Sequence, residues 1–488
     1  MKDREHPHVL ILMTDQQRGD AMSCAGHPVV RTPHMDRLAA EGVRFANAYT
    51  TSPVCMPARC NCLSGLYCHN TGQWSNYGYL PPDVDTYAHH LEKVGYRTCY
   101  IGKSHFCQPL RGEDIRDYDW YMNALGWMDV MDTGGHWATV ELKSIYTDHL
   151  QSLGLHQALV ADYEKRRHRV NGHIHGVWPS VLPEGEAISD FLAATGAAYV
   201  RNYEHNAPML LFMGFDDPHE PWDPPASWAA QYPPEQMPLP EPSSEPGEWV
   251  PEKAAARQRE WQSQLDVTEE QVRLIQSRYF AKIAHVDACM GRVLEAFEQR
   301  GWLENTVVIL WSDHGEMLCD KRRMHKGVYY EPSVHVPLVI RRPGETNAGS
   351  VAEGLAEITD IFPTILELAG CPTKEGAFGR SLVPMCDDPG ATVRDAVFSE
   401  IDAAGGRQTM VRDERYKMAI DDGGDGLMLY DLVEDPLERV NLLGKSGMED
   451  VEARLRDRLL RWHAESAVDQ RVARASFVSP GPPVRGRH

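Results

Sequence analysis

Four short apolar runs along the chain each end in a cluster of polar residues. The runs are His8–Met13, Arg97–Ile101, Pro208–Gly214 and Thr306–Trp311, followed by Asp15-Gln16, Lys103-Ser104-His105, Asp216 to His219, and Asp313-His314. Continuous apolar runs of this length are typical of buried parallel strands. Because polar groups at the carboxyl ends of parallel strands gather at one edge of a sheet, the pattern predicts a site assembled from four strand ends.

Segments with helical spacing of apolar positions separate these runs. We expect helices over Met35–Glu41, Thr86–Val94, Ile188–Tyr203, Val272–Gln299 and Thr359–Ala369. Strands that alternate with helices predict an α/β fold, in which helices flank a large, mostly parallel sheet. Residues 221–253 are dense in Pro, Glu and Trp and lack periodicity, so we expect a long surface loop or lid there.

The pattern changes after residue 372. Short strand candidates separated by Gly- and Asp-rich turns fill 373–445, and a charged helix is expected over Met448–Ala464. The 488 residues therefore predict a large α/β domain over 1–372 and a small C-terminal α+β subdomain over 373–470, an antiparallel sheet with a covering helix. The basic, Pro-rich tail 471–488 predicts either disorder or an arm that grips another subunit, and hence a homo-oligomer, a dimer or a tetramer.

Charge and cysteine content exclude several classes of protein. A formal net charge of −21 argues against binding to nucleic acid or to an anionic membrane. No run approaches the ~20 apolar residues of a membrane helix, and Val9–Met13 is too short for a signal peptide. The eleven cysteines are odd in number and lack the spacing of a disulfide framework. We expect a cytoplasmic protein with reduced thiols.

The segment Cys55-Met56-Pro57-Ala58-Arg59 predicts a reactive side chain that faces an anion. Pro57 pre-sets a helical φ and has no N–H, so it suits the first turn of a helix that begins at Cys55. Free N–H groups and the positive end of the helix dipole favour an anion at that end. Arg59 adds a permanent positive charge on the same helical face. Taken alone, a cysteine is more often a small buried hydrophobe.

Asp15, Gln16, Asp313 and His314 offer oxygen donors and one imidazole from two of the strand ends. Such donors suit Ca²⁺, Mg²⁺ or Mn²⁺ better than a thiolate-rich zinc site. Taken singly, Asp-Gln after a strand is usually a turn or a helix cap, and Asp313-His314-Gly315 also fits a strand-to-helix turn. Spacing alone therefore favours two ordinary turns over a metal site.

The segment from Cys55 to Gly65 resembles the signature of the sulfatase family, Cys-x-Pro-x-Arg followed by Leu63-Ser64-Gly65. In that family a formylglycine-generating enzyme oxidises the cysteine to formylglycine, the catalytic aldehyde. Two positions depart from the usual pattern, with Ala58 in place of Ser and Ser64 in place of Thr. The resemblance implies that Cys55 is the precursor of the nucleophile, and that the modifying enzyme is a partner of this chain.

Further motifs extend the resemblance from about residue 8 to residue 442. Those that carry chemistry are Asp15-Gln16, Gly102-Lys103-Ser104-His105, Pro218-His219-Glu220-Pro221, Ser312-Asp313-His314-Gly315-Glu316 and His325-Lys326-Gly327. The resemblance implies an alkaline phosphatase-like fold and one divalent metal ion, Ca²⁺ or Mn²⁺, with Mg²⁺ also compatible. The implied metal ligands are Asp15, Gln16, Cys55, Asp313 and His314. The implied catalytic residues are Cys55, Arg59, Lys103, His105, His219 and Lys326, with His325 as a rival for the last position.

The resemblance implies an arylsulfatase-like sulfuric ester hydrolase that cleaves sulfate monoesters of aryl or small alkyl alcohols. The alternative is a phosphonate monoester hydrolase or phosphodiesterase on the same scaffold. Gln16, which stands where the family usually has Asp, and His314 favour the alternative, whereas Lys103 and His105 favour the sulfatase.

Two further hypotheses are weaker. A metal-bearing binding protein would not need the complete set of nucleophile, metal ligands and basic residues that this chain has. In a metal-dependent phosphatase the nucleophile would be Thr51 or Ser52, and both lie outside the Cys-x-Pro-x-Arg motif. Candidates for the leaving-group pocket are Trp74, Trp127, Trp222 and the loop 221–253, although aromatic residues in loops more often simply pack.

Overall fold

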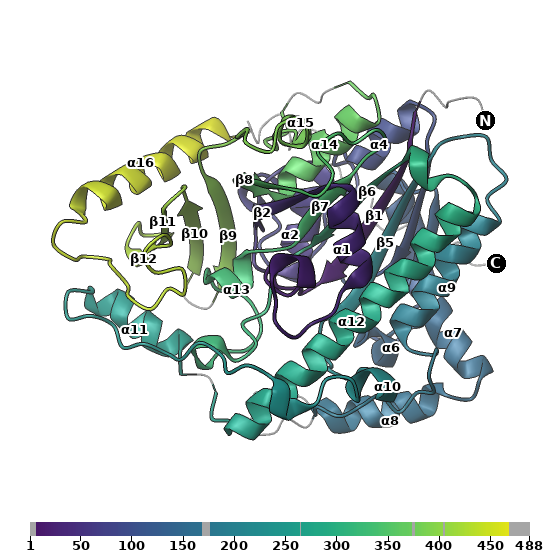
Figure 1. Cartoon of the computed structure of the whole chain (residues 1–488), viewed down its shortest axis with the longest axis horizontal. Helices are drawn as coiled ribbons and strands as arrows, with labels where there is room; N and C mark the ends of the chain where they lie inside the picture. The colour runs from purple at the N-terminus through teal and green to yellow at the C-terminus, as the bar shows by residue number, and fades with distance from the viewer. Residues whose placement is uncertain (1–5, 168–175, 264, 373–375, 404–405, 468–488) are drawn as a thin grey trace, which may run out of the picture.

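The computed structural model describes residues 6–167, 176–263, 265–372, 376–403 and 406–467. Strand β1 (His8–Asp15) lies inside its main sheet (Figure 1). In the described part of the chain this sheet has eight strands. Their order is β4 (Asp129–Asp132), β3 (Arg97–Gly102), β5 (Met209–Pro218), β1, β6 (Thr306–Ser312), β7 (Leu338–Arg341), β2 (Val43–Tyr49) and β8 (Ser350–Glu357). Only β7 runs antiparallel to its neighbours among the described strands, so the predicted mostly parallel sheet is confirmed.

Four neighbouring parallel strands bring their carboxyl ends to one edge of this sheet. β1 pairs with β5 through Val9 and Leu210, and with β6 through Val9 and Val307. β3 continues the parallel arrangement on the far side of β5. These are the four strands whose polar endings the sequence singles out, and they do end side by side.

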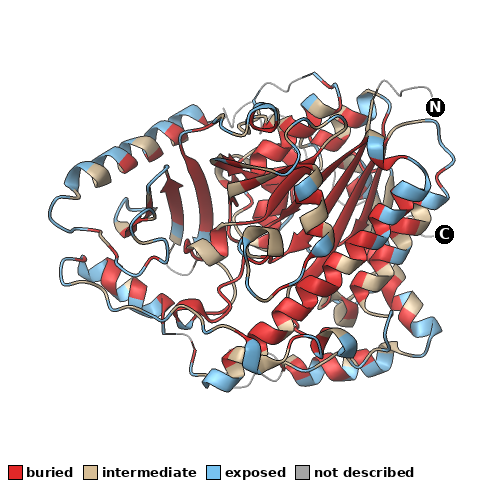
Figure 2. Cartoon of the chain, in the orientation of Figure 1, coloured by how far each residue is buried: buried red, intermediate tan, exposed pale blue. Residues whose placement is uncertain are grey.

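Helices cover both faces of the sheet, which explains why the strands read as continuous apolar runs. Val9, Ile11 and Met13 of β1 pack with the helices α2 (Cys55–Ser64), α4 (Tyr87–Lys93) and α14 (Ile361–Leu368). Leu10 and Leu12 face α1 (Pro33–Glu41), α9 (Ile188–Arg201) and α12 (Glu269–Gln299). Figure 2 shows the strands buried and α12 exposed on one side only, whereas all residues of α2 are buried.

The predicted helices are all present, with small shifts at their ends. Thr86 caps α4 by accepting a hydrogen bond from the His89 N–H, and Thr268 caps α12 in the same way. The segment predicted as one helix from Thr359 begins as a 3₁₀ turn, Ile358–Asp360, and continues as α14. Further helices are α3 (Cys68–Thr71), α5 (Asp119–Ala124), α6 (Ala138–Glu141), α7 (Ile145–Ser152), α8 (His156–Arg167), α13 (Glu331–Val334) and α15 (Val383–Asp387). Within the described ranges, none of the helices combines the length and apolar character that a bilayer crossing requires.

Residues 221–253 form an irregular segment with two short turns of helix, α10 (Ala226–Ala229) and a 3₁₀ turn, Pro234–Gln236. Its apolar side chains Trp222, Tyr232 and Met237 are buried against α12. The segment is therefore anchored to the outer layer of the fold.

The C-terminal part is the predicted antiparallel sheet with a covering helix. The strands β9 (Val397–Ala403), β10 (Gly406–Arg412), β11 (Tyr416–Asp421) and β12 (Gly426–Asp431) pair in sequence order. α16 (Glu449–Glu465) lies along this sheet (Figure 1), where Trp462 stacks on Phe398 with ring centroids 4.5 Å apart. α11 (Glu252–Trp261) contributes Ala254 and Ala255 to the same core.

The tail 471–488 lies outside the described residues, and both the oligomer and the domain boundaries stay predictions.

The amino end of α1 is capped by a side chain from α12. Thr32, at the N-cap position, makes no side-chain cap, and the N–H groups of His34 and Met35 donate to the Asp287 carboxylate at 3.1 and 2.8 Å. The Asp287 side chain is buried, and burial raises its pKa to about 7. Ionisation of this group near neutral pH therefore works against the folded state.

We predict that Asp287 makes stability fall between acidic and neutral pH. The pKa of an unfolded aspartate is 3.8, so above that value the folded chain retains a proton that the unfolded chain has lost. The free energy of unfolding then decreases up to the folded pKa. In Asp287→Asn, the decrease between about pH 5 and about pH 8 should be smaller by about 3 kcal/mol. Urea unfolding of wild type and Asp287→Asn at both pH values measures this difference. Asp457→Asn, at an exposed position, is the control. An equal pH dependence of stability in wild type and both variants would contradict the prediction.

Candidate active site

Cys55 is the first residue of α2, as the position of Pro57 predicts. All ten residues of this helix are buried, and Gly65 ends it in the left-handed conformation, with φ of 70°. The Cys55 Sγ lies 3.0 Å from Nε2 of His314 and 3.9 Å from Oδ1 of Asp15. The helix therefore delivers residue 55 directly to the carboxyl ends of β1 and β6.

Two buried carboxylates, Asp15 and Asp313, are bridged by one guanidinium. Arg59 donates from Nη2 to Asp15 at 2.8 Å and from Nε to Asp313 at 2.9 Å. Burial raises the pKa of Asp313, and the negative charge of Asp15 raises it further. Burial acts in the same direction on Asp15, but Lys103, His219 and Arg59 outweigh it and lower its pKa.

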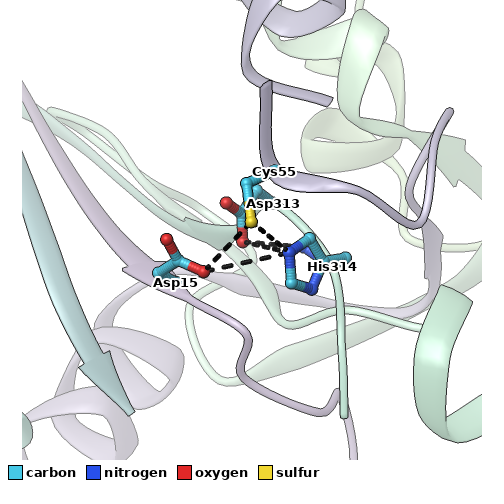
Figure 3. Close-up of side chains that lie close together, drawn as sticks. All are labelled: Asp15, Cys55, Asp313 and His314. Carbon is cyan, nitrogen blue, oxygen red and sulfur yellow. Dashed lines mark hydrogen bonds and ion pairs between the residues drawn. The ribbon is translucent and has the colours of Figure 1, made fainter. Parts of the chain in front are cut away.

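Asp15, Cys55, Asp313 and His314 form a compact group of potential metal ligands. One donor atom from each lies within 4.8 Å of the others, and Figure 3 shows the four side chains converging. A divalent cation fits this group because it would offset the repulsion that raises the pKa of Asp313. The His314 Nδ1 contacts the Gly315 carbonyl oxygen at 2.9 Å, which directs Nε2 toward Cys55.

Gln16 lies beside this group, and its side chain points to other partners. Its Oε1 accepts a hydrogen bond from Lys326, and its Nε2 donates to Glu316. The backbone N–H of Gln16 donates to Asp313 at 3.0 Å, with φ of 69°. Its role as a metal ligand stays a prediction.

Cationic and imidazole groups surround Cys55. Lys103 Nζ lies 2.6 Å from both Asp15 and Asp216. Lys326 Nζ lies 2.9 Å from Nε2 of His219. Burial alone would raise the pKa of the Cys55 thiol, but the charges of Lys326 and His314 and contacts from the two histidines at positions 105 and 219 hold it well below its usual value. Burial lowers the pKa of His105, which favours its neutral form.

The two rivals at positions 325 and 326 point in different directions. His325 contacts Glu220 at 2.7 Å, and its ring is stacked with Trp222 at a centroid distance of 6.2 Å. Lys326 faces His219 and the site. The geometry therefore favours Lys326.

Two residues that hold this machinery were not singled out from the sequence. Asp216 binds Lys103, and its place in the polar cluster after an apolar run was the available signal. Lys282 of α12 is buried and donates to the carbonyl oxygens of His219 and Pro221 at 3.0 and 2.7 Å. It also pairs with Asp217 at 2.7 Å. A lysine on the apolar side of a long helix was its only signal.

A cavity of about 370 Å³ opens beside Cys55. Its polar lining residues include Lys103, His105, His136, Asp216 and His219, together with Asn76, Gln108, Asp132 and Glu141. Its apolar lining residues include Pro109, Ile115, Met122, Trp137, Ala138 and Leu142.

The three tryptophans proposed for the leaving-group pocket lie elsewhere in the described structure. Trp127 is buried in the main core against Tyr100, Trp222 lies by His325, and Arg407 covers Trp74. Trp137 is the tryptophan that lines the cavity. The prediction for Trp127 is wrong because its apolar ring packs under the sheet.

Comparison with known proteins identifies the family. The sulfatase family model matches residues 7–371, and the model for the C-terminal part of N-sulphoglucosamine sulphohydrolase matches residues 314–465. The arylsulfatase of Clostridium perfringens is 28% identical, covering 90% of each chain. The ulvan-active sulfatase of Formosa agariphila is 30% identical over 94% of this chain and 81% of its own length. The phosphonate monoester hydrolase of Agrobacterium radiobacter superposes with a TM-score of 0.78 at 26% identity, over 94% of this chain and 96% of that chain. The chain belongs to the sulfatase family, a family of sulfuric ester hydrolases.

We predict that Gly135 is required for the placement of Lys103 and Asp216. Gly135 has φ of +94°, and an added Cβ would lie 2.7 Å from Oδ2 of Asp216 and 2.9 Å from Cδ of Lys103. Gly154 has a similar φ of +72° with nothing within 4 Å, so Gly154→Ala carries only the backbone strain. Overpacking typically costs about 1–3 kcal/mol more. Gly135→Ala should therefore be less stable than Gly154→Ala in urea unfolding and lose hydrolase activity, and equal behaviour of the two variants would contradict the prediction.

Proposed function

We propose that this chain hydrolyses sulfate monoesters with aryl or small alkyl leaving groups. The proposal rests on one observation, that residue 55 takes part in two features of the site. Its side chain belongs to the group of potential metal ligands and also lines the cavity. A reacting group there would meet a substrate inside the cavity, which Lys103 and His219 also line.

Residue 55 is proposed to act as formylglycine, and the Cys55 Sγ marks the place of its oxygens. As a hydrate, formylglycine supplies one hydroxyl for attack on sulfur and a second through which sulfate can be released, which serine does not. Asp15, Asp313, His314 and residue 55, with Gln16 on the pattern of the family, would hold one divalent cation. When bound, that cation would favour an ionised hydroxyl and neutralise charge on the ester oxygens.

His219 and Lys326 are proposed to hold the proton for the leaving group. The His219 Nδ1 contacts the Glu220 carbonyl oxygen at 2.7 Å, which requires Nδ1–H and leaves Nε2 facing Lys326. Protonation at Nε2 would place an acid at the cavity wall, beside the oxygen that leaves. Lys282 fixes this arrangement from behind through the His219 carbonyl oxygen.

Lys103, His105 and Arg59 are proposed to have different roles. Lys103 and His105 line the cavity, so they can contact the ester oxygens and the hydrate. Arg59 is buried, and its guanidinium nitrogens bond to Asp15, Asp313 and the Lys103 carbonyl oxygen. We therefore assign Arg59 to positioning the carboxylates rather than to contact with the substrate.

The cavity supports a compact, mainly apolar leaving group. Its volume is near the lower end of the range for small-molecule sites, ~300–1,000 Å³. Trp137, Met122 and Ile115 offer an apolar wall for an aromatic ring.

We predict that activity depends on conversion of Cys55 and on a divalent cation. Peptide mass spectrometry across residue 55 should find the aldehyde in active preparations, with activity proportional to the converted fraction. Cys55→Ala should lose at least about 1,000-fold in kcat/KM, since it removes the nucleophile. Cys24→Ala, outside the site, is the control. A chelator should abolish activity, and Ca²⁺, Mn²⁺ or Mg²⁺ should restore it. Full activity with unconverted Cys55 would contradict the proposal.

The alternative function is hydrolysis of phosphonate monoesters. It is favoured by Gln16 and by the superposition on the phosphonate monoester hydrolase. We predict a higher kcat/KM for 4-nitrophenyl sulfate than for 4-nitrophenyl phenylphosphonate, measured on the same converted, metal-loaded preparation. Because the leaving group is shared, the ratio reports the preference for sulfur over phosphorus. A large preference for the phosphonate would replace the first function by the second.

A further inference from the structure

A second cluster of metal-binding side chains lies away from the active site. His69 of α3, Glu400 of β9 and His463 of α16 each offer a donor atom within 4.8 Å of the other two. The His69 Nδ1 lies 3.0 Å from both carboxylate oxygens of Glu400, and the rings of His69 and His463 are 5.2 Å apart. Donors of a tetrahedral zinc ion with bonds of ~2.0–2.1 Å lie about 3.4 Å from one another. The three donor atoms are therefore close to the spacing that one zinc ion requires.

The surroundings of His69 favour metal binding. Its Nε2 lies 2.9 Å from the Ser466 hydroxyl, while Nδ1 faces Glu400. Metal-ligating histidines are characteristically held in this way, with the second ring nitrogen hydrogen-bonded.

Glu400 supplies the negative charge of the cluster. Its side chain is fully buried, and among the described residues its ion pair is with His69. A buried carboxylate is costly unless a cation compensates it.

A third cluster, Asp190, His285 and Cys289, differs because its carboxylate is already paired with a cationic side chain. Arg292 already binds Asp190 at 2.9 Å and so occupies the place of a cation. The His69 cluster has no such arginine or lysine pairing with Glu400 among the described ion pairs.

We propose that His69, Glu400 and His463 bind one Zn²⁺ ion, with water as the fourth ligand. Two imidazoles and one carboxylate are a typical zinc donor set, whereas Ca²⁺ and Mg²⁺ prefer oxygen donors. His69 and His463 are both partly buried, so the site is in part accessible to solvent. The ion would join three segments that are distant in sequence, and fasten α16 to the short helix that follows the Cys55 helix.

The test uses the full chain, stripped with a chelator and then loaded with Ca²⁺ to fill the oxygen-rich active site. Zinc content after dialysis and calorimetric titration with Zn²⁺ are compared for wild type, His463→Ala and His205→Ala. His205 is an exposed histidine outside the cluster, and it serves as the matched control. We expect His463→Ala to bind one zinc ion fewer per chain, with at least about a 100-fold weaker affinity at this site. Zinc should raise the melting temperature of wild type and His205→Ala, and not that of His463→Ala.

His69→Gln provides an independent variant, and it should lose the same zinc ion. Far-UV circular dichroism in zinc-free buffer checks that each variant is folded. Equal zinc content in wild type and both cluster variants would overturn the proposal, as would zinc binding only at millimolar concentration. Activity does not enter this test, so failure of the proposed hydrolase function would leave the zinc result unaffected.

Discussion

The bridge from Arg59 to the carboxylates of Asp15 and Asp313 is the interaction on which the active site depends. Two carboxylates buried a few ångströms apart repel one another and lack water to screen them. A single guanidinium contacts both and offsets part of this cost. Removal of one partner from a buried ion pair typically costs about 3–5 kcal/mol. Burial and the neighbouring Asp15 still raise the pKa of Asp313, so a divalent cation would stabilise the ionised form of this carboxylate.

The bridge also couples residue 55 to the sheet. Arg59 lies one turn after Cys55 on α2, so binding of its guanidinium to the ends of β1 and β6 sets the position of the whole helix. Lys103 extends the same network to Asp216 on β5. One chain of charges therefore runs across the edge of the sheet, and displacement of any member would shift the reacting residue. The buried Lys282 has a comparable place behind His219.

The apolar residues that line the cavity come from the segment between β3 and α7, which includes Trp137. The same segment also carries the polar lining residues Lys103, His105 and His136. Apolar and polar lining residues are therefore neighbours along the chain. Relatives of this chain include sulfatases, and a phosphonate monoester hydrolase has the same overall fold.

Local features of the sequence determined the strands that carry the site and the helix that begins at Cys55. The apolar runs and the proline two residues after the cysteine act within a few residues, so they can be interpreted without a structure. The strands β4, β7 and β8 were not predicted, because β4 and β7 have only four residues each and β8 lacks a continuous apolar run. The sequence placed Asp216 in a strand-end cluster but could not identify Lys103 as its partner, and the role of Lys282 likewise depends on partners on other elements. The burial of the Trp127 ring in the core was also beyond the sequence. Tertiary structure alone decided which charges meet, because burial and electrostatic compensation depend on residues that are distant in sequence.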